Sequence, residues 1–398
     1  MHLPLAPTQT YNRFILNPSF AMTPDFLQTL LREHAPAQAA EVRAVRPRLL
    51  DSSTSILSSL TAGRTAQPIG LFGLEAELRE AGQPWRTERL VLKAKPHGRA
   101  ICQMITGLAQ ACGGAVAEVY PPFEYLTGFG NTHRRELAVY ATPASPAAAL
   151  LPRVWATHAN PATDTYLVVL EDLSEGELLD SVLAPARWTD AHLRAALRQL
   201  AAWHAHHLVP PGSTPPEAAP ATWPQLAPLW EALLDHAGRR FPDLYSAARR
   251  RHLGQALREI PGNWTTLGTF AKALVHNDLN PRNTCFRPGA DGQPALVAYD
   301  WELATYHLPQ YDAVELLCFV LGPDRYHLRA PYLAYYRQQL HAHTGRFADE
   351  AAFAEGTRLA TLEFGLHRLG LYLLPHTLSP YPFLPRVIES FFAAVISC

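Results

Sequence analysis

A short polar segment, His276–Asn283, lies between two apolar runs and constrains the fold more than any other part of the sequence. The flanking runs, residues 273–275 and 284–287, are typical of short β-strands, and a third run over 295–299 leads directly into Asp300. Strands on both sides fix the two ends of the loop. We therefore expect its side chains to project from one rigid turn, close to Asp300.

The residue types at these positions suit phosphoryl transfer. Asp278 and Asn283, with His276 just before them, have the spacing of a kinase catalytic loop. There the Asp278 carboxylate would accept the proton of an attacking hydroxyl. The Asn283 amide oxygen and the Asp300 carboxylate would hold Mg²⁺, because hard cations prefer oxygen ligands. An isolated His-x-Asp motif means little, so the prediction depends on all of these positions together. We expect His276 itself to be structural.

Two features upstream fit the same chemistry. Lys93 ends the apolar run that begins at Leu90, where its ammonium group could reach nucleotide phosphates, and Glu136 on a following helix could pair with it. Lys95 shares the same strand face by the period of two. We favour Lys93, because the apolar run leads directly into it. The alternative roles are ordinary ones: an edge lysine and a solvated helical glutamate.

Backbone and hydroxyl groups would complete a nucleotide site. The run Leu167–Leu173 looks like a strand entering the connection between two lobes, and backbone groups of Glu171 and Leu173 would serve an adenine edge. Ser53 and Ser55, in a turn that contains no glycine, would contact phosphate through hydroxyl and N–H groups.

Length and composition predict more than one hydrophobic core, because the chain has 398 residues and 48% of them are hydrophobic. We expect an N-terminal extension with one helix (1–45), a strand-rich lobe (46–173, hinge at 170–173) and a helical lobe (174–398). The expected strands lie at 48–50, 55–57, 89–95, 154–158 and 165–170, and the expected helices at 23–34, 101–112, 132–140, 190–208, 224–236 and 243–259.

The net charge of −1 predicts no affinity for nucleic acid or an anionic membrane. No apolar run approaches the roughly 18 residues of a membrane helix, and we see no signal peptide. The five cysteines form no CxxC pair, which indicates reduced thiols in the cytoplasm. Basic residues other than Lys93, Lys95 and Lys272 are all arginine, as in GC-rich bacterial genomes. We expect a monomer or a homodimer.

The sequence resembles the aminoglycoside phosphotransferase and choline kinase superfamily, including its ecdysteroid-kinase-like branch. The matching segments occur in the family's order: Leu-Val-Leu-Lys (90–93), Arg-Glu-Leu-Ala-Val-Tyr (135–140), Val-Leu-Glu-Asp-Leu (169–173), Leu-Ala-Ala-Trp-His-Ala (200–205), the loop 276–283, and Tyr-Asp-Trp-Glu (299–302). The resemblance implies an α+β, protein-kinase-like bilobal fold, with an N-terminal antiparallel sheet lobe and a larger, mainly helical C-terminal lobe. It also implies ATP and Mg²⁺, and a packing role for His204.

Two positions depart from the family pattern. Asn277 stands where the family usually has glycine, and the expected phosphate loop at Ser53 and Ser55 lacks one. The short distance from Asp300 to Asp312 leaves no room for a long activation segment, which argues against a protein kinase. Asp312 matches a family aspartate at a helix start, which we expect to brace the catalytic loop.

The acceptor should be a small-molecule alcohol bound by the C-terminal helices. Residues 331–398 balance five acidic residues against five arginines and are rich in tyrosine and phenylalanine. This favours a neutral or hydrophobic acceptor over a polycation. Two alternatives stay open: an antibiotic-inactivating phosphotransferase acting on aminoglycosides or macrolides, and a catalytically impaired pseudokinase that serves as a binding module.

Overall fold

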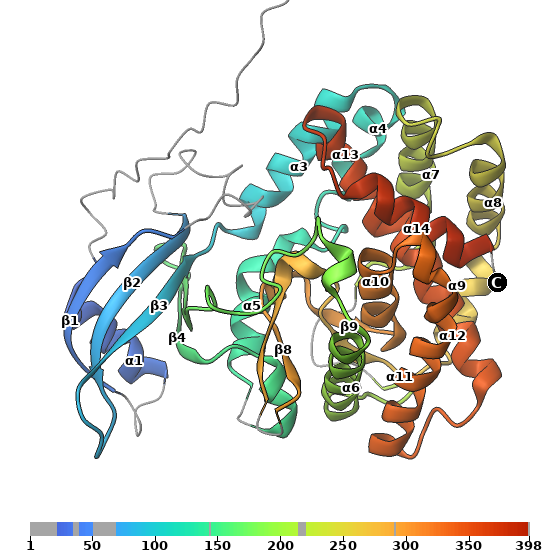
Figure 1. The fold of residues 1–398 in the computed structure, drawn as a ribbon. Coiled ribbons are helices and arrows are strands. Elements are labelled where there is room, and N and C mark those ends of the chain that lie inside the picture. The colour runs from blue at the N-terminus through green and yellow to red at the C-terminus, as the bar shows by residue number, and fades with distance from the viewer. Residues whose placement is uncertain are drawn as a thin grey trace, which may run out of the picture.

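The computed structural model describes residues 22–34, 40–50, 69–142, 145–213, 220–289 and 292–396. An antiparallel sheet near the N-terminus lies beside a larger, mainly helical lobe (Figure 1). The expected fold class is confirmed. Ser53 and Ser55 lie outside the described residues, as does the strand expected at 55–57.

The sheet of the first lobe has the strand order β1-β2-β3-β5-β4, with antiparallel neighbours throughout. Its register places Lys93 of β3 opposite Val168 of β5 and opposite Leu71 of β2. The strands are β1 (Glu41–Arg48), β2 (Gly70–Arg79), β3 (Arg86–Ala94), β4 (Val154–Asn160) and β5 (Thr165–Glu171).

β5 is apolar along its length because both of its faces are covered. Leu167 and Val169 point into the core of the sheet lobe. Tyr166, Val168 and Leu170, in the alternate positions, belong to the core of the helical lobe. Because successive side chains of an extended strand point to opposite faces, β5 contributes to both cores and connects them.

Helix α1 (Pro24–His34) covers the other face of the sheet. Thr23 caps it by accepting the Phe26 N–H at 3.1 Å, and Leu27, Leu30 and Leu31 are buried against the strands. The expected boundary at residue 45 falls inside β1.

Two strand predictions were inaccurate. In place of the strand expected at 48–50, the structure has β1, which begins at Glu41 and ends at Arg48. Strand β2 (70–79) was not foreseen. β1 is an edge strand with charged, half-exposed positions, so its sequence carries little hydrophobic alternation.

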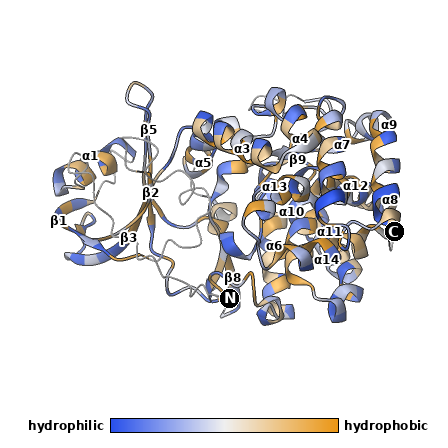
Figure 2. Ribbon diagram, turned by 90° about the horizontal axis from the view of Figure 1, so that it is seen from above, coloured by the Kyte–Doolittle hydropathy of each residue, from blue (hydrophilic) through white to orange (hydrophobic). Residues whose placement is uncertain are grey.

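The helical lobe surrounds helix α10, every residue of which is buried. Figure 2 shows the two lobes side by side, with α3 and α5 near their junction. In the described part of the chain, no helix is long and apolar enough to cross a membrane. The helices are α3 (Gly98–Cys112), α4 (Gly114–Val119), α5 (Thr132–Tyr140), α6 (Asp190–His206), α7 (Trp223–Arg240), α8 (Ala247–Arg258), α9 (Ile260–Leu267), α10 (Gln310–Val320), α11 (Arg329–Thr344), α12 (Glu350–Glu363), α13 (Gly370–Leu378) and α14 (Leu384–Ile396).

Two small antiparallel pairs hold the central loop. β6 (Ala273–Val275) pairs with β9 (Thr305–His307), and β7 (Thr284–Pro288) pairs with β8 (Pro294–Ala298). Segment 276–283 therefore connects one pair to the other, as the sequence predicted.

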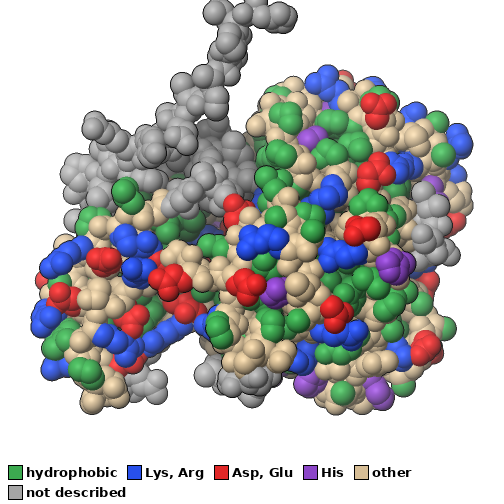
Figure 3. Space-filling view, viewed as in Figure 1, with side chains coloured by type: hydrophobic (Ala, Val, Ile, Leu, Met, Phe, Trp, Pro, Cys, Tyr) green, Lys and Arg blue, Asp and Glu red, His purple; other side chains and the backbone are tan. Residues whose placement is uncertain are grey.

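Acidic and basic side chains are intermingled over the sheet lobe on the face drawn in Figure 3. That face shows no extended patch of a single charge, in keeping with the net charge of −1.

The packing of α1 generates a stability prediction. Leu30→Ala should lower the free energy of unfolding by about 2–4 kcal/mol, because it leaves a cavity between helix and sheet. Urea denaturation measures this loss in the free energy of unfolding. Leu49→Ala is the matched control, since that side chain is 93% exposed and should change stability by less than about 0.5 kcal/mol. Equal effects of the two substitutions would contradict the packing of α1.

Candidate active site

The loop 276–283 is held by two acidic residues of the buried helix α10. Asp312 accepts the backbone N–H of His276 at 2.7 Å and that of Asn277 at 3.0 Å. Glu315, one turn further along, accepts the Leu279 N–H at 2.8 Å. Asp312 thus lies where the sequence placed it, bracing the loop.

Asn277 adopts the left-handed conformation, with φ of +62°. Glycine reaches this region without a steric cost, and asparagine is among the few other residues that tolerate it. The Asn277 side chain also donates to the Leu303 carbonyl at 3.0 Å. The departure from the family glycine therefore preserves the backbone path. His276 is structural as expected, because its ring contacts the Tyr299 carbonyl at 2.9 Å.

The two carboxylate oxygens of Asp278 have different surroundings. Oδ1 accepts from Asn280 at 2.8 Å and from the Tyr372 hydroxyl at 2.8 Å, and it lies 2.5 Å from the Arg368 guanidinium. Oδ2 accepts only from the Asn283 amide, at 3.0 Å, among the described residues. Oδ2 is therefore the oxygen with a lone pair left for a further partner.

Arg368 and Tyr372 were not foreseen from the sequence. Arg368 lies in a π-helical turn, residues 364–369, between α12 and α13, and Tyr372 lies on the same face one turn later. Such turns often occur at functional sites. The spacing of four residues was a visible signal, but nothing local connects it to a loop so distant in sequence. Arg282 was also missed; it donates to the Tyr372 hydroxyl at 2.7 Å.

Lys93 and Lys95 both reach Glu136 of α5, which is fully buried. Lys93 also contacts Asp300, whereas Lys95 pairs with Glu302 at 2.9 Å. The predicted pairing of Glu136 with the strand lysine is present, and Lys95 shares it.

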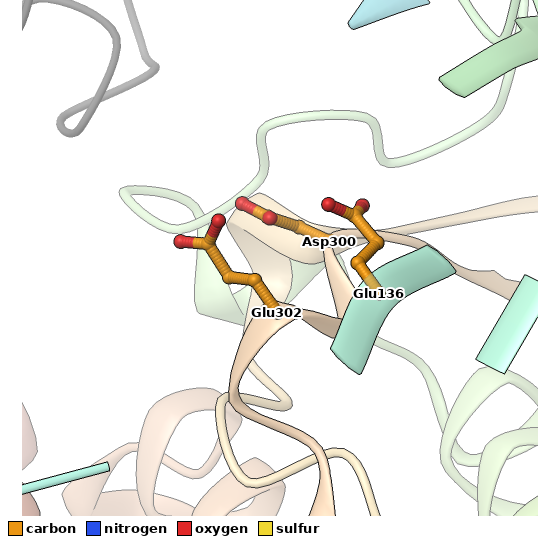
Figure 4. A group of neighbouring side chains, drawn as sticks. All are labelled: Glu136, Asp300 and Glu302. Carbon is orange, nitrogen blue, oxygen red and sulfur yellow. The ribbon is translucent and has the colours of Figure 1, made fainter. Parts of the chain in front are cut away.

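Three carboxylates converge at this point (Figure 4). Oxygens of Glu136, Asp300 and Glu302 lie within 4.8 Å of one another, the first from α5 and the other two from the segment after β8. In the sequence, Glu302 stands out only as part of the matching segment 299–302. Like Asn277, Asp300 has a positive φ, of +66°.

The charges around Asp300 and Asp278 hold both groups ionised. Burial alone would raise the pKa of Asp300, but the ammonium groups of Lys93 and Lys95 outweigh it and lower the pKa to about 2. Burial likewise opposes ionisation of Asp278, and the guanidinium groups of Arg368 and Arg282 lower its pKa below the usual value. For Glu302, burial and then the neighbouring Asp300 carboxylate raise the pKa.

The expected hinge lies where β5 ends. The Glu171 side chain accepts from the Arg153 N–H at 2.7 Å and from Arg287 at 2.9 Å. The Leu173 N–H has no hydrogen-bond partner within the described chain, so it is available to a ligand.

A cavity of about 430 Å³ lies between the lobes and unites these features. Lys93, Glu136, Glu171, Leu173, Asp278, Asn283 and Asp300 all line it. Apart from Ser53 and Ser55, every residue that the sequence singled out for the site therefore faces one space. Asn280, within the loop, and Asp312 of α10 hold the loop backbone through hydrogen bonds.

Comparison with protein families agrees with this geometry. A sequence model described as the phosphotransferase enzyme family (APH) matches residues 133–352, more than half of the chain. The chain belongs to this family. It is accordingly a phosphotransferase with a hydroxyl group as acceptor. No curated protein sequence matches the chain.

Solved structures of several phosphotransferases are similar to this one. An ethanolamine kinase of Plasmodium vivax is 9% identical, with 88% of this chain and 81% of that chain covered and a TM-score of 0.41. The GDP complex of wild-type aminoglycoside 2′-phosphotransferase-IIIa is 14% identical, covering 94% and 99%, with a TM-score of 0.41. A glucosamine kinase is 16% identical, covering 88% and 98%, with a TM-score of 0.39.

The backbone at Asn277 gives a second prediction. Asn277→Ala should be less stable than Asn277→Gly by about 1–2 kcal/mol, since both lose the contact with Leu303 but only alanine bears the left-handed strain. Urea denaturation of the two variants side by side measures the difference. An alanine variant as stable as the glycine variant would show that this conformation is not required.

Proposed function

We propose that this phosphotransferase moves the γ-phosphate of ATP to a hydroxyl of a small metabolite or natural product. The observation that carries the proposal is the single cavity into which Lys93, Asn283 and Asp300 face together with Asp278. ATP would bind between the lobes with its adenine edge at Glu171 and Leu173. Ser53 and Ser55 stay candidates for phosphate contacts.

Burial separates the roles of the two lysines. Lys95 is almost fully buried between Glu136 and Glu302, so it offsets part of the negative charge that these carboxylates place in the interior. The Lys93 side chain is more exposed, and its partner Asp300 is the carboxylate expected to take a metal. We therefore assign phosphate binding to Lys93 and a structural role to Lys95.

The residues present fit Mg²⁺. The Asp300 carboxylate and the Asn283 amide oxygen are hard oxygen donors, and both residues line one cavity. The Asn283 amide nitrogen donates to Asp278, so the amide oxygen can serve as the ligand to the metal. When bound, Mg²⁺ would supply charge neutralisation to the phosphates. Glu302, 2.9 Å from Lys95, is a neighbour of this site.

Asp278 would orient the acceptor and take its proton. The acceptor oxygen forms a bond to the γ-phosphorus while the bond from that phosphorus to the bridging oxygen of ADP breaks, and the hydroxyl proton passes to Oδ2 of Asp278. A carboxylate whose pKa is lowered is a weak base, so the proton moves late and positioning supplies most of the catalysis.

Helices α3 and α13 give the cavity an apolar wall. Met104, Ile105 and Leu108 of α3 face it together with Leu371 and Pro375 of α13. We therefore propose an acceptor with a hydrophobic body.

The C-terminal acidic residues are engaged elsewhere and none lines the cavity, which disfavours a polycationic antibiotic. Asp349 caps α12, and the others pair as Glu350–Arg337, Glu355–Arg358, Glu363–His307 and Glu389–Arg249.

Two observations disfavour a pseudokinase. Asn277 keeps the backbone path of a glycine, and the residues proposed for chemistry line one cavity.

Cys102, Cys112, Cys285 and Cys318 are free thiols, which supports a cytoplasmic location. A bacterial origin and a monomeric or homodimeric state remain proposals from the sequence.

Asp278→Ala should reduce phosphoryl transfer by about 10²–10⁴-fold while ATP still binds, because the base is lost and the phosphate ligands remain. Transfer is read as phosphate added by mass over a panel of alcohols, aminoglycosides and macrolides, and ATP binding by calorimetry. Asp235→Asn, in an exposed ion pair on α7, is the control. Near-normal turnover in the Asp278 variant would refute its role.

The two lysine variants should fail differently. Lys93→Ala should weaken ATP binding by about tenfold or more, since it removes a phosphate contact worth about 1.4 kcal/mol or more. Lys95→Ala should instead lower the free energy of unfolding by about 3–5 kcal/mol, because buried Glu136 and Glu302 lose a partner. Calorimetric titration with ATP and urea denaturation separate the effects. An affinity loss confined to the Lys95 variant would reverse the assignment.

A further inference from the structure

We propose that the acceptor alcohol carries an anionic group, a carboxylate or a phosphate, which Arg282 binds beside Asp278. The inference rests on the proposed phosphoryl transfer and names the substrate class of the same site. It changes the expectation of a neutral acceptor and keeps the hydrophobic body.

Arg282 lines the cavity as a cation held by neutral groups. Its Nε donates to the Asn280 side-chain oxygen at 3.2 Å, and one terminal nitrogen donates to the Tyr372 hydroxyl at 2.7 Å. Its guanidinium lies 4.9 Å from the centre of the Phe383 ring. Among the described residues it forms no ion pair of its own, and the nearby Asp278 carboxylate pairs with Arg368. The site thus fixes the direction of the guanidinium and leaves it with only a share in the charge of Asp278.

Arg368 adds a second guanidinium to the same wall. It forms an ion pair with Asp278, so its charge and that of the carboxylate offset each other. The buried Nε of Arg368 has no hydrogen-bond partner among the described residues. Once Asp278 is balanced in this way, Arg282 gives this part of the cavity an excess of positive charge.

Within the described chain, none of the other carboxylates that line the cavity forms an ion pair with Arg282. Asp300, Glu136 and Glu302 contact the two lysines, Glu171 pairs with Arg287, and Asp172 pairs with Arg48.

A guanidinium fixed in direction suits an oxyanion, because its planar array of donors matches a carboxylate or a phosphate. Met104, Leu108 and Leu371 form apolar walls of the same cavity. The chemistry that fits both features is an alcohol with a hydrophobic body and one anionic group. An ammonium group at this position would meet like charge.

Matched probes that differ only in charge test the proposal. We would measure calorimetric binding, in the presence of ADP and Mg²⁺, of ω-hydroxydecanoate, ω-hydroxydecanamide and ω-aminodecanol, with the corresponding six-carbon compounds as a second set. ω-Hydroxydecyl phosphate distinguishes a phosphate from a carboxylate. We expect an anion to bind at least about tenfold more tightly than the amide, and the amine to bind least.

Arg282→Gln should reduce the preference for the anion over the amide to near one, and Arg282→Lys should retain part of it. Arg239→Gln, which removes an exposed arginine of α7, should leave the preference intact. Equal binding of anion and amide, tighter binding of the amine, or no binding of any probe would overturn the proposal. So would a loss in Arg282→Gln that is equal for all probes, which would indicate a contact with a part of the molecule that all probes share.

Mg²⁺-dependent ATP hydrolysis, compared with that of Asp300→Asn, is measured in parallel. Hydrolysis that is absent, or equal in the two proteins, counts against the proposed phosphoryl transfer. The binding preference is measured without turnover, so it still decides whether this cavity recognises anions.

Discussion

The architecture of the site depends on one buried carboxylate, that of Asp312. It has no contact with solvent, and a charge in that position is tolerable only if its oxygens are fully hydrogen-bonded. Two of the donors are the N–H groups of His276 and Asn277, and the third is the His204 ring at 3.1 Å. Burial alone would raise the pKa of Asp312, but its contacts with His204 and His276 outweigh burial and lower the pKa.

The His204 ring, the third donor to Asp312, connects the loop to the rest of the helical lobe. The other ring nitrogen of His204 lies 2.6 Å from the Tyr336 hydroxyl, which itself donates to the Pro309 carbonyl at 2.7 Å. The Tyr336 hydroxyl gives its one proton to the Pro309 carbonyl, so it accepts from the ring nitrogen that faces it. The His204 ring therefore joins Asp312 and the loop to Tyr336. These contacts account for a buried histidine in the last turn of helix α6 and agree with the packing role that the resemblance implied.

The sequence predicted the loop and its flanking strands because the determinants are local. Spacing alone relates Asp278 to Asn283, and an apolar run locates Asp300. The partners Arg368 and Tyr372 could not be found in this way, because they reach Asp278 across the fold from a π-helical turn that the sequence pattern does not reveal. Edge strand β1 was misplaced for a related reason, since its pairing with β2 is decided by a partner far along the chain.

The choice between Lys93 and Lys95 shows what periodicity alone cannot settle. A period of two places both on one face, and both reach Glu136. Their surroundings separate them, because Lys95 is enclosed by two carboxylates whereas Lys93 bridges Glu136 to Asp300. If nucleotide and metal bind as proposed, the contact between Lys93 and Asp300 must break. Lys93 then contacts phosphate, and Asp300 then contacts the metal. Lys95 stays paired with Glu136 and Glu302 throughout that exchange. The second lysine therefore permits the first to move without leaving a buried charge unpaired.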